Sequence, residues 1–250
     1  MTGIYDDSHI PGLKKVAEAV HRYGAKAVSQ INHAGRQTTS AVIGKTPLAP
    51  SAVANKLTGL TPREMTHAEI EETIEAFGRA SLRAKAAGFD AVQIHAAHGF
   101  LISSFNSPYT NTRQDEWGGT AEKRMRFITE VYREVRRQVG GDYPVLAKLN
   151  ADDCLECGIT VGEVSEIALR LERLGIDAIE ISGGMAESKV GFIRAGIVLA
   201  GSRSSQMCPI TDELPIRRHA ASDPASRPRN HARWSGPSWG WACWRPSRSL

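Results

Sequence analysis

The chain has 250 residues, of which 41% are hydrophobic and 23% are charged, and its formal net charge is +4. This composition excludes disorder of the whole chain, and no apolar run approaches the ~20 residues that a membrane span needs. Four cysteines are too few for a disulfide scaffold, and the first residues do not form a signal-peptide pattern, so we expect a soluble, cytoplasmic protein.

The excess of positive over negative charge comes from the end of the chain. Residues 201–250 hold eight Arg, no Lys and three acidic residues, together with six of the 12 prolines and four of the five tryptophans. No helix or strand pattern organises this charge, so we expect neither a nucleic-acid nor a membrane partner. We predict a folded domain over residues 1–190 and an irregular tail over 191–250. Its composition is typical of a GC-rich coding strand read out of frame, or of a natural partner-binding tail.

In chain order, the first predicted helix begins near Pro11, because proline favours the first helical turn, and it ends at Gly24. Residues 26–31 predict a short strand. A long loop with little periodicity follows over residues 37–65. Loops of this length are uncommon unless they serve a site.

Strands and helices alternate along the rest of the folded part. Two of the helices begin with a capping box, in which Thr66 and Thr160 each precede a glutamate by three residues. The predicted order is helix 66–88, strand 89–94, helix 121–139, strand 145–149, helix 160–175 and strand 177–182. This alternation predicts an α/β fold with parallel strands and helical crossovers. A barrel of eight such units and an open doubly wound sheet both fit the pattern.

Functional side chains of parallel α/β folds gather at the carboxyl ends of the strands. Gln30 and Lys148 lie near the ends of two predicted strands, and His95 and His98 follow a third. The two histidines could donate hydrogen bonds to an oxyanion, or bind a metal with a third ligand such as His33. They could equally be loop histidines bound to backbone carbonyls. Nothing else supports a metal, and we expect none.

Two other groups of residues are weaker candidates. Cys154 and Cys157 form a C-x-x-C pair, which could be a redox pair or half of a zinc site, but no second close pair exists. Two incidental loop cysteines are the preferred interpretation. Arg113, Asp115 and Glu116 predict a salt-bridged corner of a loop and not catalytic groups.

Three motifs stand in a fixed order along the chain: Gln30–Arg36 (QINHAGR), Ile94–Leu101 (IHAAHGFL) and Ser107–Gly119 (SPYTNTRQDEWGG). Glu122–Phe127 and the strand that holds Lys148 continue the series. Together they resemble the old yellow enzyme family of FMN-dependent ene-reductases and NADH:flavin oxidoreductases. The resemblance covers about residues 3–184. It implies a partial (β/α)8 barrel of roughly the middle four βα units, with FMN at the carboxyl ends of the strands.

The resemblance also implies a role for each candidate residue. Gln30 would bind the flavin pyrimidine ring, and Lys148 would lie near flavin N1 and O2, where a cation stabilises the anionic reduced ring. His95 and His98 would bind the carbonyl oxygen of an enone or enal, whose alkene receives hydride that NADH or NADPH first delivers to the flavin. Phe100 stands where the family usually has a proton-donating tyrosine.

Four predicted strands are half of what a closed barrel needs. We therefore expect a chain truncated at both ends, with weak or no FMN binding and with unpaired sheet edges that favour self-association. One alternative is a catalytically inactive fragment that does not retain flavin. Another is a flavin-free aldolase in which Lys148 is a Schiff-base nucleophile. The cysteine spacing predicts no iron–sulfur cluster.

Overall fold

The computed structural model describes residues 2–188. The predicted irregular tail, 191–250, lies outside the described residues. Within the described residues, no helix is both long and apolar enough to cross a membrane.

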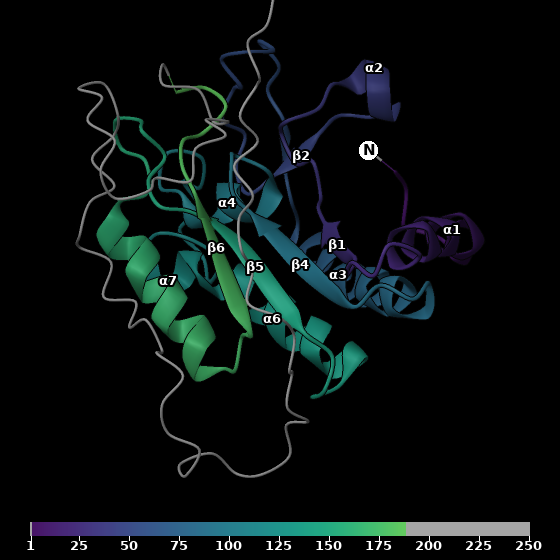
Figure 1. Ribbon diagram of the computed structural model, residues 1–250. Helices are drawn as coiled ribbons and strands as arrows, with labels where there is room; N and C mark the ends of the chain where they lie inside the picture. The colour runs from purple at the N-terminus through teal and green to yellow at the C-terminus, as the bar shows by residue number, and fades with distance from the viewer. Residues whose placement is uncertain (1, 189–250) are drawn as a thin grey trace, which may run out of the picture. The chain divides into compact units, whose positions relative to one another are not determined.

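A four-stranded parallel sheet forms the centre of the described part (Figure 1). Its strands, in spatial order, are β1 (Val28–Ile31), β4 (Ala91–Ala96), β5 (Val145–Asn150) and β6 (Ala178–Ser182). All four correspond to predicted strands, and all neighbours are parallel, as predicted. Within the described residues β1 and β6 are the edges of this sheet. Self-association through those edges stays a prediction, which sedimentation analysis would test.

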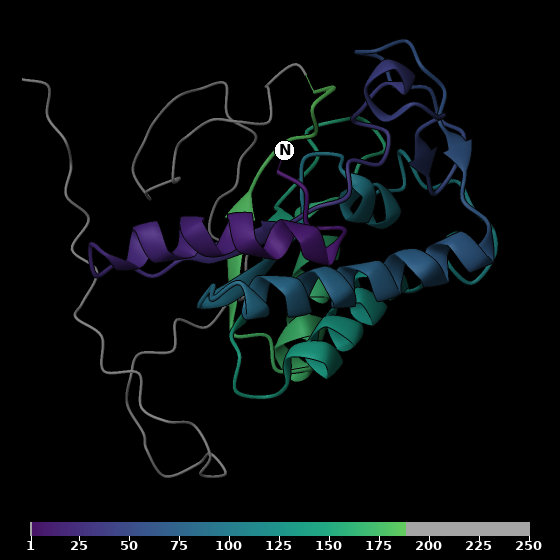
Figure 2. The same ribbon diagram turned by 90° about the vertical axis from the view of Figure 1, so that its right-hand side faces the viewer.

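Helical crossovers join the strands and cover one face of the sheet (Figures 1 and 2). They are α3 (His67–Ala86), α6 (Arg126–Val139) and α7 (Val161–Arg173). Helix α1 (Ile10–His21), which follows a 3-10 turn at Asp7–His9, packs beside α3. A doubly wound sheet carries helices on both faces. The one-sided cover of the described sheet is that of a (β/α) barrel, and the described residues make up part of one.

Local sequence explains where the main helices begin. At α3, the Thr66 hydroxyl accepts the Glu69 N–H and the Glu69 carboxylate accepts the Thr66 N–H, so the predicted capping box is present. The Thr160–Glu163 box does the same for α7. The helix predicted over residues 121–139 is broken at Met125, which separates α5 (Ala121–Arg124) from α6.

The two faces of the sheet carry different residues, because successive side chains of a strand point to opposite sides. One face packs on the helices and forms the hydrophobic core. It includes Ile31, Val92, Ile94, Val145, Ala147 and Leu149, all at most 3% exposed. The other face, which corresponds to the inside of a barrel, carries the polar residues Gln30, Gln93, His95, Lys148 and Glu180.

Several short elements were not predicted. The segment 37–65 contains α2 (Ser40–Ile43) and two strands that pair in parallel, β2 (Leu48–Ala49) and β3 (Arg63–Glu64). Helix α4 (Leu101–Asn106) follows the histidine motif and is buried at every residue. Helices of four or six residues complete fewer than two turns, and strands of two residues show no alternation, so pattern analysis misses them.

Candidate active site

The predicted site residues meet at one end of the sheet. His95 of β4 is in register with Lys148 of β5, and Gln30 of β1 is in register with Gln93 of β4. His98 follows β4 directly, and its ring centroid lies 5.2 Å from that of His95. Gln30, Lys148 and the two imidazoles therefore lie together on the inner face of the sheet, toward the carboxyl ends of its strands.

A chain of hydrogen bonds connects all four strands across this face. Gln30 Nε2 donates to Gln93 Oε1 at 2.6 Å, and Gln93 Nε2 donates to Glu180 Oε2 at 2.8 Å. Glu180 Oε1 lies 2.9 Å from Lys148 Nζ. Gln93 and Glu180 were not among the site residues predicted from the sequence. The signal that could have found them is a polar residue at the inward position of an otherwise apolar strand.

Glu180 balances the charge of Lys148. Burial by itself raises the pKa of Glu180, but the hydrogen bonds from Lys148 and Gln93 outweigh it and lower the pKa below its usual value. The carboxylate is therefore charged at neutral pH. Lys148 therefore has an anionic partner that the sequence did not reveal.

The two imidazoles are neutral at physiological pH. His95 and His98 are 6% and 8% exposed, and their rings meet edge to face at 90°. Burial, followed by the charges of His98 and Lys148, lowers the pKa of His95 to about 4. Burial and the charge of Lys148 lower the pKa of His98 to about 4 as well.

Local contacts determine which ring nitrogens can donate. His95 Nδ1 accepts the Ala97 N–H at 3.3 Å, so the neutral ring carries its proton on Nε2. His98 Nε2 lies 2.7 Å from Ser182 Oγ, and this hydroxyl suits either tautomer because it both donates and accepts. Imidazole N–H groups in a buried site can stabilise negative charge on a carbonyl oxygen.

Phe100 lies beside this pair. It precedes α4, and its ring centroid is 4.9 Å from that of His95. A phenyl ring has no acidic proton, so Phe100 can shape the site but cannot act as an acid there.

The loops around the site are fixed by buried arginines. Arg36, 1% exposed, donates to the carbonyls of Val53 and Ala54 and forms an ion pair with Glu187 at 2.5 Å. This pair joins the loop after β1 to the segment after β6. This pairing was not predicted, because residues 151 positions apart give no local signal.

The predicted corner at Arg113 is confirmed. Arg113 pairs with Asp115 at 2.6 Å. It also donates to the carbonyls of Pro50 and Met65, so it fixes the long segment before α3. Glu116 pairs with Arg126.

The inner face fits the polar edge of a flavin ring in the kind of groups it offers. The exposed Gln30 amide can donate and accept hydrogen bonds, and Lys148 supplies a cation on the same face of the sheet. Among residues 2–188, no group of three His, Cys, Asp or Glu side chains could hold a metal ion.

The chain is similar in sequence and in structure to known oxidoreductases. The profile of the NADH:flavin oxidoreductase / NADH oxidase family matches residues 1–189. The NADH oxidase of Thermoanaerobacter brockii is 47% identical over 184 residues, which are 73% of this chain and 28% of that protein.

Two solved structures share the fold. Morphinone reductase in complex with tetrahydroNAD has a TM-score of 0.65 at 33% identity, over 72% of this chain and 55% of that one. The old yellow enzyme homologue from Zymomonas mobilis has a TM-score of 0.66 at 29% identity, over 77% and 57%. The chain spans less than a third of the NADH oxidase and little more than half of either structural neighbour. The family profile, the parallel sheet and the ordered motifs agree. The chain therefore belongs to the NADH:flavin oxidoreductase / NADH oxidase family.

Proposed function

We propose that this chain supplies the substrate-binding imidazoles and part of the flavin site of an FMN-dependent oxidoreductase. Its reaction would reduce the alkene of an α,β-unsaturated carbonyl compound with hydride from NADH or NADPH. The observation that carries this proposal is the buried pair of neutral imidazoles, 5.2 Å apart, beside the inner-face layer of Gln30, Gln93, Lys148 and Glu180.

The imidazoles would act on the carbonyl oxygen of the substrate. The Nε2–H of His95, together with His98, would donate hydrogen bonds to that oxygen and draw electron density from the conjugated alkene. The β-carbon then becomes the electron-poor position. Bound FMN would supply the hydride that this carbon accepts.

Gln30 and Lys148 would hold the pyrimidine half of the flavin. The Lys148 ammonium favours negative charge on the ring, and Glu180 reduces this effect because it is paired with the same ammonium. Lys148 and Glu180 together would set how strongly the protein favours the reduced ring.

Phe100 limits the second half of the reaction. After hydride transfer the α-carbon needs a proton, and the aromatic ring beside His95 cannot give one. We propose that water protonates this carbon.

The alternatives make different demands on Lys148. An aldolase needs the Lys148 amine free to attack a carbonyl, whereas Lys148 Nζ lies 2.9 Å from Glu180 Oε1 in an ion pair. A chain that retains no flavin is the other alternative, and cofactor content distinguishes it.

Reconstitution of the full chain with FMN tests the proposal. We expect bound flavin after desalting, and NADH or NADPH consumption that depends on 2-cyclohexenone. His95→Leu should abolish turnover of the enone while flavin stays bound, and Gln30→Leu should weaken flavin binding. Ser81→Ala, in a buried hydrogen bond within α3, is the matched control and should change neither. If no flavin remains bound to the wild-type chain, the inactive alternative holds.

A further inference from the structure

The turn that carries His98 has an unusual backbone conformation. His98 has a φ of +63° and Gly99 a φ of +79°, so two successive residues lie in the left-handed region. Glycine adopts this region readily, whereas a residue with a β-carbon is disfavoured there. A β-carbon at position 99 would also lie 2.6 Å from Gln37 Nε2. The surrounding structure must therefore hold His98 in a conformation that it does not favour by itself.

Two side chains bind the amides of this turn. Asn150 Oδ1 accepts the His98 N–H at 3.0 Å, and Ser103 Oγ accepts the Gly99 N–H at 3.1 Å. Only the first of these bonds acts on the backbone of His98 itself. The orientation of the Asn150 amide therefore decides whether the bond from the His98 N–H to Asn150 can form.

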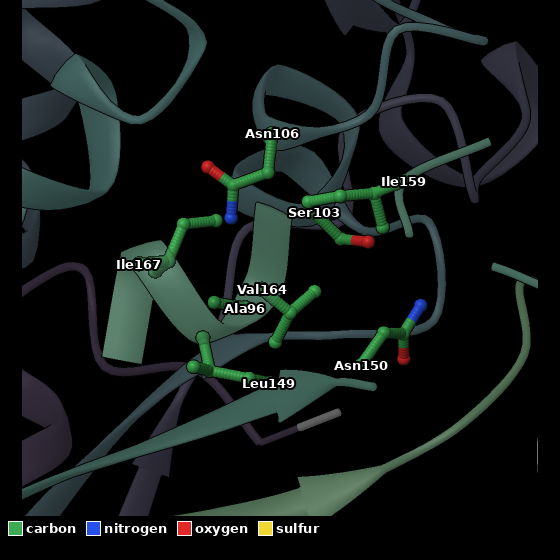
Figure 3. A pocket seen from close by; sticks show the side chains of 8 residues that line it. All are labelled: Ala96, Ser103, Asn106, Leu149, Asn150, Ile159, Val164 and Ile167. Atoms are coloured by element: carbon green, nitrogen blue, oxygen red, sulfur yellow. The ribbon is translucent and has the colours of Figure 1, made fainter. Parts of the chain in front are cut away.

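Packing does not determine that orientation. Asn150 lies at the edge of a small pocket between β5, α4 and α7, with Ile167 on the opposite side (Figure 3). Ser103 and Asn106 also line the pocket, which has room for about one water molecule. The oxygen and the NH₂ group of an asparagine have nearly the same size. Hydrogen bonds must therefore determine which of them faces His98.

Asp153 supplies the deciding hydrogen bond. Its side chain is fully buried, and the carboxylate accepts the Asn150 Nδ2–H at 3.0 Å and the Ile159 N–H at 3.0 Å, together with the Ser107 hydroxyl. Burial raises the pKa of Asp153, and these three hydrogen bonds oppose that rise. A carboxylate only accepts, so the NH₂ group of Asn150 must face Asp153 and its oxygen must face His98.

We propose that Asp153 is a positioning residue for the imidazole pair: through Asn150, its buried carboxylate holds the His98 backbone in the left-handed conformation that brings the His98 ring to His95. The role in turnover rests on the proposed function. The positioning itself does not, because every group in the relay belongs to this chain.

Asp153→Asn in the full chain tests the relay directly. A carboxamide offers one acceptor in place of two, so it cannot serve Asn150 and Ile159 together. NMR of ¹⁵N-histidine-labelled protein should show altered ring and amide signals of His98. The pKa of the His98 ring should rise by one unit or more from about 4, because the ring leaves its buried position. In the FMN-loaded chain, kcat/KM for 2-cyclohexenone should fall tenfold or more.

A second variant and a control keep the test decisive. Asn150→Ala breaks the same relay and leaves Asp153 its bonds from Ile159 and Ser107, so it should produce the same His98 change even if Asp153→Asn does not fold. Ser81→Ala removes a buried hydrogen bond in α3 and should leave the His98 signals as they are. Unchanged His98 signals and titration in the folded variants would overturn the proposal. A wild-type chain without flavin would instead defeat the proposed function and leave this result standing.

Discussion

The two faces of the four-stranded sheet are held by different forces. On the helix side, apolar residues such as Val92, Val145 and Leu149 pack at 1% exposure or less. On the inner side, Gln93, Lys148 and Glu180 are held by hydrogen bonds and an ion pair. The stability of the fold depends mainly on the first face, and the candidate chemistry depends on the second. Changes to each face should therefore have separable effects.

The largest loss of stability is expected from a substitution on the helix side of the sheet. Phe127 is fully buried and stacks on Phe105 with ring centroids 4.1 Å apart. Phe127→Ala should lower the free energy of unfolding by about 3–5 kcal/mol, because it removes packing and leaves a cavity. Urea denaturation measures this. A loss below about 1 kcal/mol would contradict a core concentrated on this face.

The pH dependence of stability tests the inner face. Unfolded histidine binds a proton near pH 6.5, whereas folded His95 and His98 do so only near pH 4. Between these values the unfolded state binds more protons, so stability falls as the pH is lowered through this window. Between pH 7 and 5 the two rings together should cost roughly 2–4 kcal/mol.

Urea denaturation at several pH values measures this effect. The His95→Gln/His98→Gln double variant should show a flatter dependence. His33, whose pKa burial also lowers, contributes to the dependence that remains. If the double variant shows an equally steep dependence, groups other than His95 and His98 must titrate in this window.

A smaller effect is expected at a helix end outside both faces. Thr66→Ala removes the side-chain half of the capping box of α3 and should cost about 1 kcal/mol. The thermal unfolding midpoint should fall by a few degrees, with FMN binding unchanged. Altered FMN binding in this variant would show that the site is coupled to the α3 terminus.

The smallest effect on stability is expected from Glu180→Gln. The Glu180 side chain is 52% exposed, so its loss should cost less than about 1 kcal/mol. Its charge raises the pKa values of His95 and His98, and its removal should lower both. NMR titration of the two rings checks this, with Glu75→Gln on the surface of α3 as a control. Unchanged titration would show that Glu180 does not act on the pair.

Much of the fold could be predicted from local patterns. The capping boxes at Thr66 and Thr160 mark helix starts through bonds that span three residues, and a local sequence shows such bonds directly. The motif residues His95, His98, Gln30 and Lys148 could be placed near the same end of the sheet, because parallel strands align their carboxyl ends.

The remaining site residues depend on distant parts of the chain. Gln93 and Glu180 meet across 87 residues, and Arg36 meets Glu187 across 151. Helix α4 has only six residues and shows no period. Asp153 acts on His98 through Asn150, and neither residue carries a local signature of that role.

The sequence by itself determined the alternation of strands and helices, their parallel arrangement and the identity of the imidazole pair. The alternation is visible in patterns a few residues long, and strands that helices connect pair in parallel. Tertiary structure alone decided that Glu180 neutralises Lys148, that burial keeps both imidazoles neutral and that Asp153 orients Asn150. The physical reason is that charge pairing and desolvation depend on distances in space, which only the packed strands define.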